Sequence, residues 1–316
     1  MRWLIVGILL LTGVLGWTGY ASWQGYLTTP IPLESDVQYD VQPGTSLGAV
    51  ALDLHARHWL KRPRWFVWYA RSRGYEARIR AGEYSIHAGI TPVGLLELLV
   101  SGEVIQHAFT IIEGSTFADV RNSLSADPLI TQTFDDLSDA AVMDELGLGG
   151  EHPEGRFLPE TYYYTRGTSE RELLLRAYEH MSQTLARLWS ERDPETLLKT
   201  PYEALILASI IEKETALDSE RPEISGVFSR RLQKGMRLQS DPTVIYGIGP
   251  SYDGNIRKKD LTTDTAYNTY TRGGLTPTPI AMPGEASIYA ALHPKAGSAL
   301  YFVATGDPDG SHYFSD

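Results

Sequence analysis

Residues 200–215 read TPYEALILASIIEKET, and this segment gives the chain its clearest helix. Thr200 and Glu203 have the spacing of a capping box, and Pro201 stands at the first helical position, where its missing N–H is not needed. Residues 205–211 are apolar nearly all round, which predicts a buried helix. We therefore expect the core of the largest domain to form around this segment.

Two carboxylates, Glu212 and Glu214, close the same helix. Glu212 shares a helical face with Leu205 and Ser209. Loss of hydration favours the protonated form of a carboxyl group at the rim of an apolar helix, and an acid that stays protonated near neutrality can protonate a sugar leaving group. The alternative interpretation is that both glutamates mark the point where the helix emerges into water. Periodicity alone leaves the two interpretations open.

The N-terminal segment has the properties of a membrane anchor. No charged residue occurs between Trp3 and Trp23, a length of about 31 Å as a helix, which matches a bilayer core. Arg2 precedes this segment and Glu34 is the first charge after it, so we expect a single-pass protein of the plasma (inner) membrane. Its N-terminus would be cytoplasmic and the rest of the chain periplasmic or extracellular. A cleaved signal peptide is the alternative, although residues 20–22 (Tyr-Ala-Ser) form a poor cleavage site.

The remaining chain divides into three expected parts. Residues 24–36 form a polar tether. Residues 37–104 are expected to read strand-helix-helix-strand, an order that resembles the small LysM-like glycan-binding module, and residues 105–316 predict a mixed α+β domain. The fold class is therefore α+β with an N-terminal transmembrane helix over residues 1–23.

One local pattern recurs three times, as a strand that ends at a glycine, followed by a hydroxyl residue and a helical apolar spacing. The predicted N-cap residues are Ser46, Thr91 and Thr116. A further pair of segments, residues 300–304 and 312–314, predicts a β-hairpin at the end of the chain.

Composition excludes several classes of function. The chain has 316 residues, a formal net charge of −11 and no cysteine. An acidic chain is a poor partner for nucleic acid, and the lack of cysteine excludes disulfides and thiolate chemistry. The eight histidines show no zinc-binding spacing, and no nucleotide-binding loop is present. We expect neither a metal nor a cofactor.

Polar and aromatic residues gather in the second half. After an amphipathic helix at residues 221–234, a predicted polar loop carries Gln239, Asp241 and Tyr246. Asn268 and Tyr270 follow in a second polar segment. Such amide, hydroxyl and aromatic groups line sugar-binding sites, and they are also common in ordinary loops.

Several of these stretches together resemble one family. They are ASIIEKET at residues 208–215, GMRLQSDPTVIYG at residues 235–247, YNTY at residues 267–270 and GRFLPETY at residues 155–162. Together, in their order along the chain, they resemble the endolytic murein transglycosylases of the MltG or YceG-like family. The resemblance covers nearly the whole chain, and Glu160 stands where the family pattern has an aspartate.

The resemblance implies a lyase that cleaves the β-1,4 bond between N-acetylmuramic acid and N-acetylglucosamine within peptidoglycan glycan strands, leaves 1,6-anhydro ends and terminates nascent strands. It implies Glu212 as the catalytic acid and base, and peptidoglycan synthases as partners. The residues expected to hold the substrate or orient the acid are Gln239, Asp241, Tyr246, Asn268, Tyr270, Glu160 and Glu214. Two alternatives remain: a non-catalytic glycan-binding scaffold, and a two-carboxylate hydrolase that pairs Glu212 with Glu160 or Asp241.

The chain departs from the family pattern at two places. Residues 275–278 read LTPT where the family has Leu-Pro-Pro, which affects a turn beside the expected site. The family also continues past the last hairpin with a polar segment and a helix. We expect their absence from this sequence to weaken activity or stability if that tail packs beside the cleft.

Overall fold

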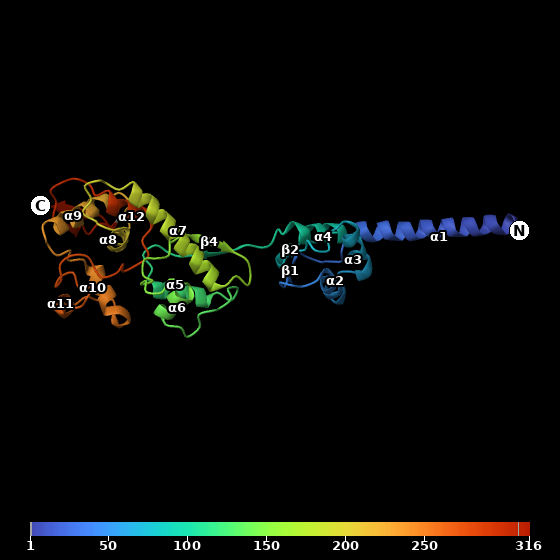
Figure 1. The fold of residues 1–316 in the computed structure, drawn as a ribbon, viewed down its shortest axis with the longest axis horizontal. Helices are drawn as coiled ribbons and strands as arrows, with labels where there is room; N and C mark the ends of the chain where they lie inside the picture. The colour runs from blue at the N-terminus through green and yellow to red at the C-terminus, as the bar shows by residue number, and fades with distance from the viewer. Residues whose placement is uncertain (1, 309) are drawn as a thin grey trace. The chain divides into compact units, whose positions relative to one another are not determined.

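The computed structural model describes residues 2–308 and 310–316. The chain divides into two compact units, one ending at His107 and the other starting at Ala108 (Figure 1).

The first unit contains a long helix and a small α/β module. Its elements are α1 (Arg2–Thr28), β1 (Val37–Val41), α2 (Leu47–Ala56), α3 (Pro63–Ser72), β2 (Gly82–Ile86) and α4 (Pro92–Ser101). Strands β1 and β2 pair antiparallel, with Tyr39 opposite Tyr84. The predicted strand-helix-helix-strand order is therefore present, and the kinship to the LysM fold stays a prediction.

Helix α1 is longer than the predicted anchor. It continues to Thr28, so residues 24–28 of the predicted tether are helical. The segment Trp3–Thr28 is long and apolar enough to cross a bilayer, and none of its most apolar window is buried in the protein. A signal sequence at the N-terminus has the same properties.

The second unit is mixed α+β. After β3 (His107–Thr110) it contains α5 (Phe117–Ala126), α6 (Asp139–Glu145), β4 (Thr161–Tyr164), α7 (Glu170–Ser190), α8 (Pro201–Glu214), α9 (Arg221–Gln233), α10 (Asp241–Ile248), the 3-10 turn Gly249–Ser251, α11 (Lys258–Thr262), α12 (Glu285–Leu292), β5 (Tyr301–Ala304) and β6 (His312–Ser315). Strand β3 pairs with β4, and β5 pairs antiparallel with β6. The predicted terminal hairpin is confirmed.

The three predicted hydroxyl caps are also confirmed. Ser46, Thr91 and Thr116 are the N-cap residues of α2, α4 and α5, and each side chain accepts a hydrogen bond from the backbone N–H three residues later. Such a cap stabilises a helix by about 1 kcal/mol.

Helix α8 lies at the centre of the second unit, as its sequence predicts. All eight residues 204–211 are buried, and α8 packs against α12, α9 and α7. Its Ser209 hydroxyl accepts a hydrogen bond from the backbone N–H of Ile280 at 3.0 Å, which fixes the segment before α12 against the helix.

One loop prediction was wrong. The predicted polar loop after Gln239 becomes helix α10 from Asp241 onward, because Pro242 lies in the first turn, where a helix tolerates proline.

Candidate active site

A polar pocket of about 230 Å³ lies in the second unit, beside the C-terminal end of α8. Its lining residues are Glu214, Arg231, Leu238, Gln239, Asp241, Tyr270, Phe302, Val303, Ala304 and His312. Four of the sequence-predicted site residues, Glu214, Gln239, Asp241 and Tyr270, thus meet here. Glu212, Tyr246, Asn268 and Glu160 are not among the lining residues.

Glu214 is the last residue of α8 and is partly buried. Its Oε1 accepts a hydrogen bond from the Ser240 hydroxyl. Burial raises the pKa of Glu214 to about 7, against the opposing effect of this hydrogen bond. A carboxyl group with a pKa of about 7 is half protonated at neutral pH, so it can give up a proton and take one back.

The loop that leads into α10 forms one wall of the pocket. Gln239 has a φ of 55°, in the left-handed region that residues other than glycine seldom occupy. Its backbone N–H donates to the Thr269 carbonyl at 3.2 Å, and the N–H of Ser240 donates to the Thr269 hydroxyl at 2.9 Å. These bonds join two sequence segments that are thirty residues apart. Strained backbone held in this way is common at functional sites.

Asp241 and Tyr270 form a pair across the same wall. The Tyr270 hydroxyl donates to Oδ1 of Asp241 at 2.5 Å. Burial, and next the bond to Asp241, raise the pKa of Tyr270, so the phenol stays protonated. The pair presents a carboxylate and an aromatic ring to the pocket, and both groups suit a sugar ligand.

Arg231 supplies a buried cation to the pocket. Its side chain is 7 % exposed and donates to three carbonyl oxygens, those of Leu300, Leu238 and Arg237, at 2.6, 2.8 and 3.2 Å. It also donates to Oε1 of Gln239 at 3.3 Å. Arg231 therefore ties the terminal hairpin and the Gln239 loop to α9.

His312 enters the pocket from strand β6. Its ring Nδ1 lies 2.7 Å from Oε2 of Glu220, the residue that precedes α9. Glu220 is 9 % exposed. The pair resembles the carboxylate–histidine arrangement that fixes the orientation of an imidazole in many enzymes.

The side chain of Glu212 lies in different surroundings from that of Glu214. Its side chain is 6 % exposed, its Oε2 accepts from the backbone N–H of Gly284 at 2.9 Å, and its Oε1 lies 3.6 Å from Arg221. Gly284 is the N-cap residue of α12, where the helix dipole favours a negative charge. These contacts give Glu212 a role in joining α8 to α12.

A further carboxylate, Glu113, lies close to Glu212. A Cβ atom added at Gly284 would meet Glu113 Oε1 at 1.9 Å, so this carboxyl group rests directly on the residue that Glu212 contacts. Burial and then the charge of Glu212 raise the pKa of Glu113. The Glu113, Glu212 and Arg221 group is a second charged cluster, and none of its members lines the pocket of Glu214.

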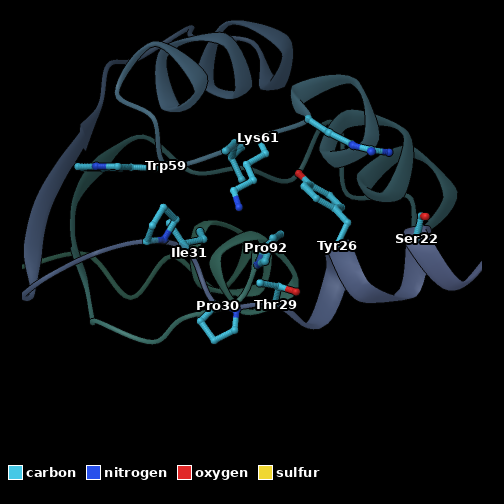
Figure 2. Close-up of a pocket in the computed structure, with 11 residues that line it drawn as sticks. Ser22, Tyr26, Thr29, Pro30, Ile31, Trp59, Lys61 and Pro92 are labelled. Atoms are coloured by element: carbon cyan, nitrogen blue, oxygen red, sulfur yellow. The ribbon is translucent and has the colours of Figure 1, made fainter.

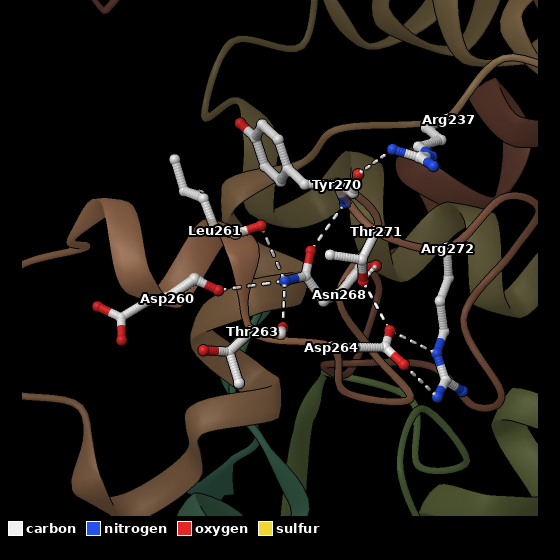
Figure 3. Close-up of polar contacts among 9 residues, drawn as sticks. All are labelled: Arg237, Asp260, Leu261, Thr263, Asp264, Asn268, Tyr270, Thr271 and Arg272. Carbon is white, nitrogen blue, oxygen red and sulfur yellow. Dashed lines mark hydrogen bonds and ion pairs between the residues drawn. The ribbon is translucent and has the colours of Figure 1, made fainter.

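Asn268 acts on the backbone around it (Figure 3). It is 1 % exposed, and its amide donates to the carbonyl oxygens of Asp260, Leu261 and Thr263 at 3.1, 3.2 and 2.7 Å. Its Oδ1 accepts from the N–H of Tyr270 at 2.8 Å. In this structure Asn268 therefore positions Tyr270 and does not face the pocket.

Tyr246 and Glu160, the other two predicted site residues, also make their contacts outside the pocket. The Tyr246 hydroxyl donates to Oε2 of Glu154 at 2.9 Å, and neither residue lines the pocket. Glu160 is 48 % exposed and lies 3.0 Å from His180 Nδ1. In the part of the chain that the structure describes, no group of three His, Cys, Asp or Glu residues is arranged to hold a metal ion.

Sequence reasoning did not select Arg231, Glu220 or His312. Arg231 lies in the predicted helix at residues 221–234 and His312 in the predicted terminal hairpin, but no periodicity assigns them a role. The left-handed conformation of Gln239 has no sequence signal of its own, because glycine is the usual marker of that conformation.

Comparisons with known proteins agree with one another. The model of the YceG-like family matches residues 39–316. The chain is 30 % identical over 295 residues to a protein of Bacillus subtilis (strain 168) named endolytic murein transglycosylase, and this match covers 86 % of the chain and 81 % of that relative.

A protein of the same name from Streptococcus pneumoniae serotype 2 is 28 % identical over 310 residues. The match covers 88 % of the chain and 54 % of that longer relative. A crystal structure described as a putative yceG-like protein from Listeria monocytogenes superposes with a TM-score of 0.57 at 27 % identity, covering 90 % of the chain and 96 % of that structure.

Proposed function

The chain belongs to the YceG-like family, and from this premise we propose that it cleaves peptidoglycan glycan strands internally, as a lytic transglycosylase. Two similar proteins carry the name endolytic murein transglycosylase, so the chain is placed among enzymes that act on peptidoglycan. The scissile bond would be the β-1,4 linkage from N-acetylmuramic acid to N-acetylglucosamine.

The geometry favours Glu214 over Glu212 as the acid and base. Glu214 lies in a pocket with amide, carboxylate and aromatic groups, and burial raises its pKa to about 7. Glu212 is held by Arg221 and by the N–H of Gly284. This difference in surroundings is the single observation that carries the assignment, and Glu212 remains the competing candidate.

The reaction needs one carboxyl group. Protonated Glu214 donates its proton to the bridging oxygen as the bond from muramic C1 to that oxygen breaks. The resulting carboxylate then takes the proton of the C6 hydroxyl, while the C6 oxygen bonds to C1 and closes a 1,6-anhydro ring. The glutamic acid is restored and no water is consumed. An internal hydroxyl competes well with water because it is already held near C1.

The neighbouring residues would hold the sugars. Asp241 and Tyr270 offer an acceptor and an aromatic face, and Gln239 offers an amide for the acetamido group of the substrate. His312 and Arg231 place positive charge beside Glu214, and both charges lower its pKa to a smaller extent than burial raises it. In these surroundings Glu214 can change between the protonated acid and the carboxylate during the reaction.

Of the two alternatives, only the hydrolase has a specific observation in its favour. A hydrolase would need a second carboxylate to activate water, and Asp241 is the one that shares the pocket with Glu214. Glu160, the other residue considered, is exposed and outside the pocket. A non-catalytic scaffold would bind glycan through the same pocket or through the LysM-like module, and would not need the acid at all.

Helix α1 would anchor the enzyme with its N-terminus in the cytoplasm and the second unit outside. The only cation before the apolar segment is Arg2, apart from the terminal amine, and the first acidic residues follow the segment. An anchored endolytic enzyme would meet glycan strands as synthases release them at the membrane, and could terminate strand elongation there.

The test is the identity of the new ends. The full chain in detergent is incubated with purified peptidoglycan, and the products are examined by mass spectrometry. Muramic ends lighter by one water, the 1,6-anhydro form, support the transglycosylase. Hydrolysed reducing ends would support the muramidase instead, and unchanged strands would leave only the binding role.

A further inference from the structure

The first unit carries a concentration of positive charge that the proposed reaction does not use. Residues 57–80 contain a single acidic residue, Glu76, in a chain of net charge −11. The basic residues of this stretch are Arg57, Lys61, Arg62, Arg64, Arg71, Arg73, Arg78 and Arg80. Arg57 and Arg71 pair with Asp53 and Glu76. Within residues 2–308 and 310–316, no carboxylate oxygen lies within 4.0 Å of Lys61, Arg62 or Arg64.

Two of these cations border a pocket of about 270 Å³. It is formed by the end of α1, the segment after it, and the loop before α3, with Pro92 of α4 (Figure 2). The amine of Lys61 points into the pocket, toward the space between Ile31, Tyr26 and Pro92 (Figure 2). Arg62 lies over the ring of Trp65, 4.0 Å from its centroid.

The pocket wall also contains an unsatisfied donor. The Tyr26 hydroxyl is buried and has no hydrogen-bond partner among the described residues. A buried hydroxyl without a partner costs about 1–3 kcal/mol, so a ligand that accepts its hydrogen bond would recover that free energy. A bound oxyanion would accept this hydrogen bond beside the two cations that line the same pocket.

The position of the pocket relative to the bilayer follows from the length of α1. A bilayer core of about 30 Å takes about twenty helical residues, which places its outer edge near Ser22 when the span begins at Trp3. Tyr26 lies one turn further, about 6 Å beyond that edge, where the headgroup phosphates are. This placement rests on the proposed membrane anchor.

An aromatic cluster marks the same boundary. Trp23 of α1 packs edge-on against Trp65 and Trp68 of α3, with ring centroids 5.4 and 4.9 Å apart. Trp68 is nevertheless 61 % exposed. Exposed tryptophans and adjacent cations are typical of surfaces that lie at a membrane interface.

We propose that the pocket between α1 and α3 binds the phosphate of an anionic phospholipid of the surrounding bilayer, with Lys61 and Arg62 as the cations and the Tyr26 hydroxyl as a donor. A neutral glycan offers no charge to the two cations that line the pocket, whereas the phosphodiester of a lipid headgroup carries one negative charge. A pocket of about 270 Å³ suits a single headgroup. Bound lipid would hold the first unit against the membrane surface.

The test measures lipid retention by the full chain. The protein in neutral detergent is titrated with phosphatidylglycerol, and bound lipid is counted by native mass spectrometry. We expect one lipid to bind most tightly in the wild type, and to bind at least about tenfold more weakly after combined Lys61→Gln and Arg62→Gln changes. Tyr26→Phe keeps the ring contact with Trp65 and should weaken binding about threefold.

The matched control removes two charges from the other end of α3. The double variant Arg71→Gln and Arg73→Gln changes the net charge as much as the Lys61 and Arg62 variant does, at positions about 13 Å further along the helix. It should bind phosphatidylglycerol within about twofold of wild type. If both double variants lost lipid binding equally, the lipid would be held by diffuse electrostatic attraction, and the proposed site in the pocket would be wrong. Equal retention of phosphatidylcholine, or displacement by millimolar inorganic phosphate, would also overturn it.

The proposed lipid site and the proposed enzymatic activity can be disproved independently of each other. The Lys61 and Arg62 variant should cut soluble glycan strands at the wild-type rate, because these residues belong to the first unit and not to the pocket of Glu214. Release of the wild-type chain from membranes by alkaline carbonate would contradict the anchor, whatever the lipid titration shows.

Discussion

Glu220 and His312 are joined by two bonds: the backbone N–H of His312 donates to Oε1 of Glu220 at 2.7 Å, and the ring Nδ1 lies 2.7 Å from Oε2. The Thr215 hydroxyl donates to the same carboxylate at 3.2 Å. Although burial acts to raise it, these bonds from His312 hold the pKa of Glu220 below its usual range. Glu220 thus fixes the terminal hairpin beside the end of α8, where Glu214 lies.

Replacement of His312 by asparagine should shift the pH profile of cleavage. Asparagine can keep a hydrogen bond to Glu220 but removes the imidazole charge, which lowers the pKa of Glu214. The alkaline limb of kcat/KM should therefore move to higher pH by a fraction of a unit. A purely structural role for His312 would lower the rate and leave the position of the limb unchanged.

Cleavage by the wild type should fall as the pH rises through about 7. The acid must be protonated when it meets the bridging oxygen, and burial raises the pKa of Glu214 to about 7. Above this value the rate should drop about tenfold per pH unit. The measurement is the initial rate of strand cleavage from pH 5 to pH 9. A flat profile over that range would contradict an acid with this pKa.

The surroundings of Glu154 predict how the stability of the fold depends on pH. Its carboxyl group accepts hydrogen bonds from the Phe117 N–H and the Tyr246 hydroxyl at 3.0 and 2.9 Å, yet burial raises its pKa from the ordinary 4.5 to about 7. The folded state therefore holds a proton that the unfolded chain releases, and the free energy of unfolding falls as the pH rises from about 4.5 to about 7.

Glu154→Gln removes this titration and keeps an acceptor for the Phe117 N–H. At pH 8 the variant should be more stable than wild type by about 1–2 kcal/mol, and at pH 4.5 the difference should vanish or reverse. Urea unfolding at the two pH values measures both quantities. A variant that is less stable than wild type at pH 8 would show that the carboxylate form is the one the fold prefers.

Asn268→Ala should loosen the loop that carries Tyr270. The variant leaves three carbonyl acceptors and the Tyr270 N–H without their partner, at a cost of about 2–4 kcal/mol. Because Asn268 does not line the pocket, KM should rise more than kcat falls. Asn268→Asp is the comparison, since it keeps the acceptor for Tyr270 and loses the three donations. Wild-type KM in both variants would contradict the positioning role.

Local sequence signals predicted much of the fold correctly. Thr200, Ser46 and Thr116 cap the helices that their spacing predicts, and the apolar run of α8 is buried throughout. Such signals succeed because a cap or an apolar face depends on residues three or four positions apart. Helix α10 was missed because the pair Asp241-Pro242 begins a turn and a helix equally well.

The choice between Glu212 and Glu214 could not be made from the sequence. Periodicity places the two side chains on different faces of α8, but it does not say which face meets Gly284 and which meets the Gln239 loop. That depends on the path of segments more than twenty residues away. The role of Asn268 was equally hidden, because an amide that binds backbone and an amide that binds sugar have the same sequence signature.

The most direct measurement compares Glu214→Gln with Glu212→Gln in the same glycan cleavage assay, with the folded fraction of each variant determined by circular dichroism. We expect Glu214→Gln to lose at least about 10³-fold in the rate of anhydro-end formation while remaining folded. Glu212→Gln, which loses its ion pair with Arg221, should be less stable but should cut within about tenfold of wild type per folded molecule. A folded Glu214→Gln that cuts at the wild-type rate, beside an inactive folded Glu212→Gln, would contradict the assignment of the acid.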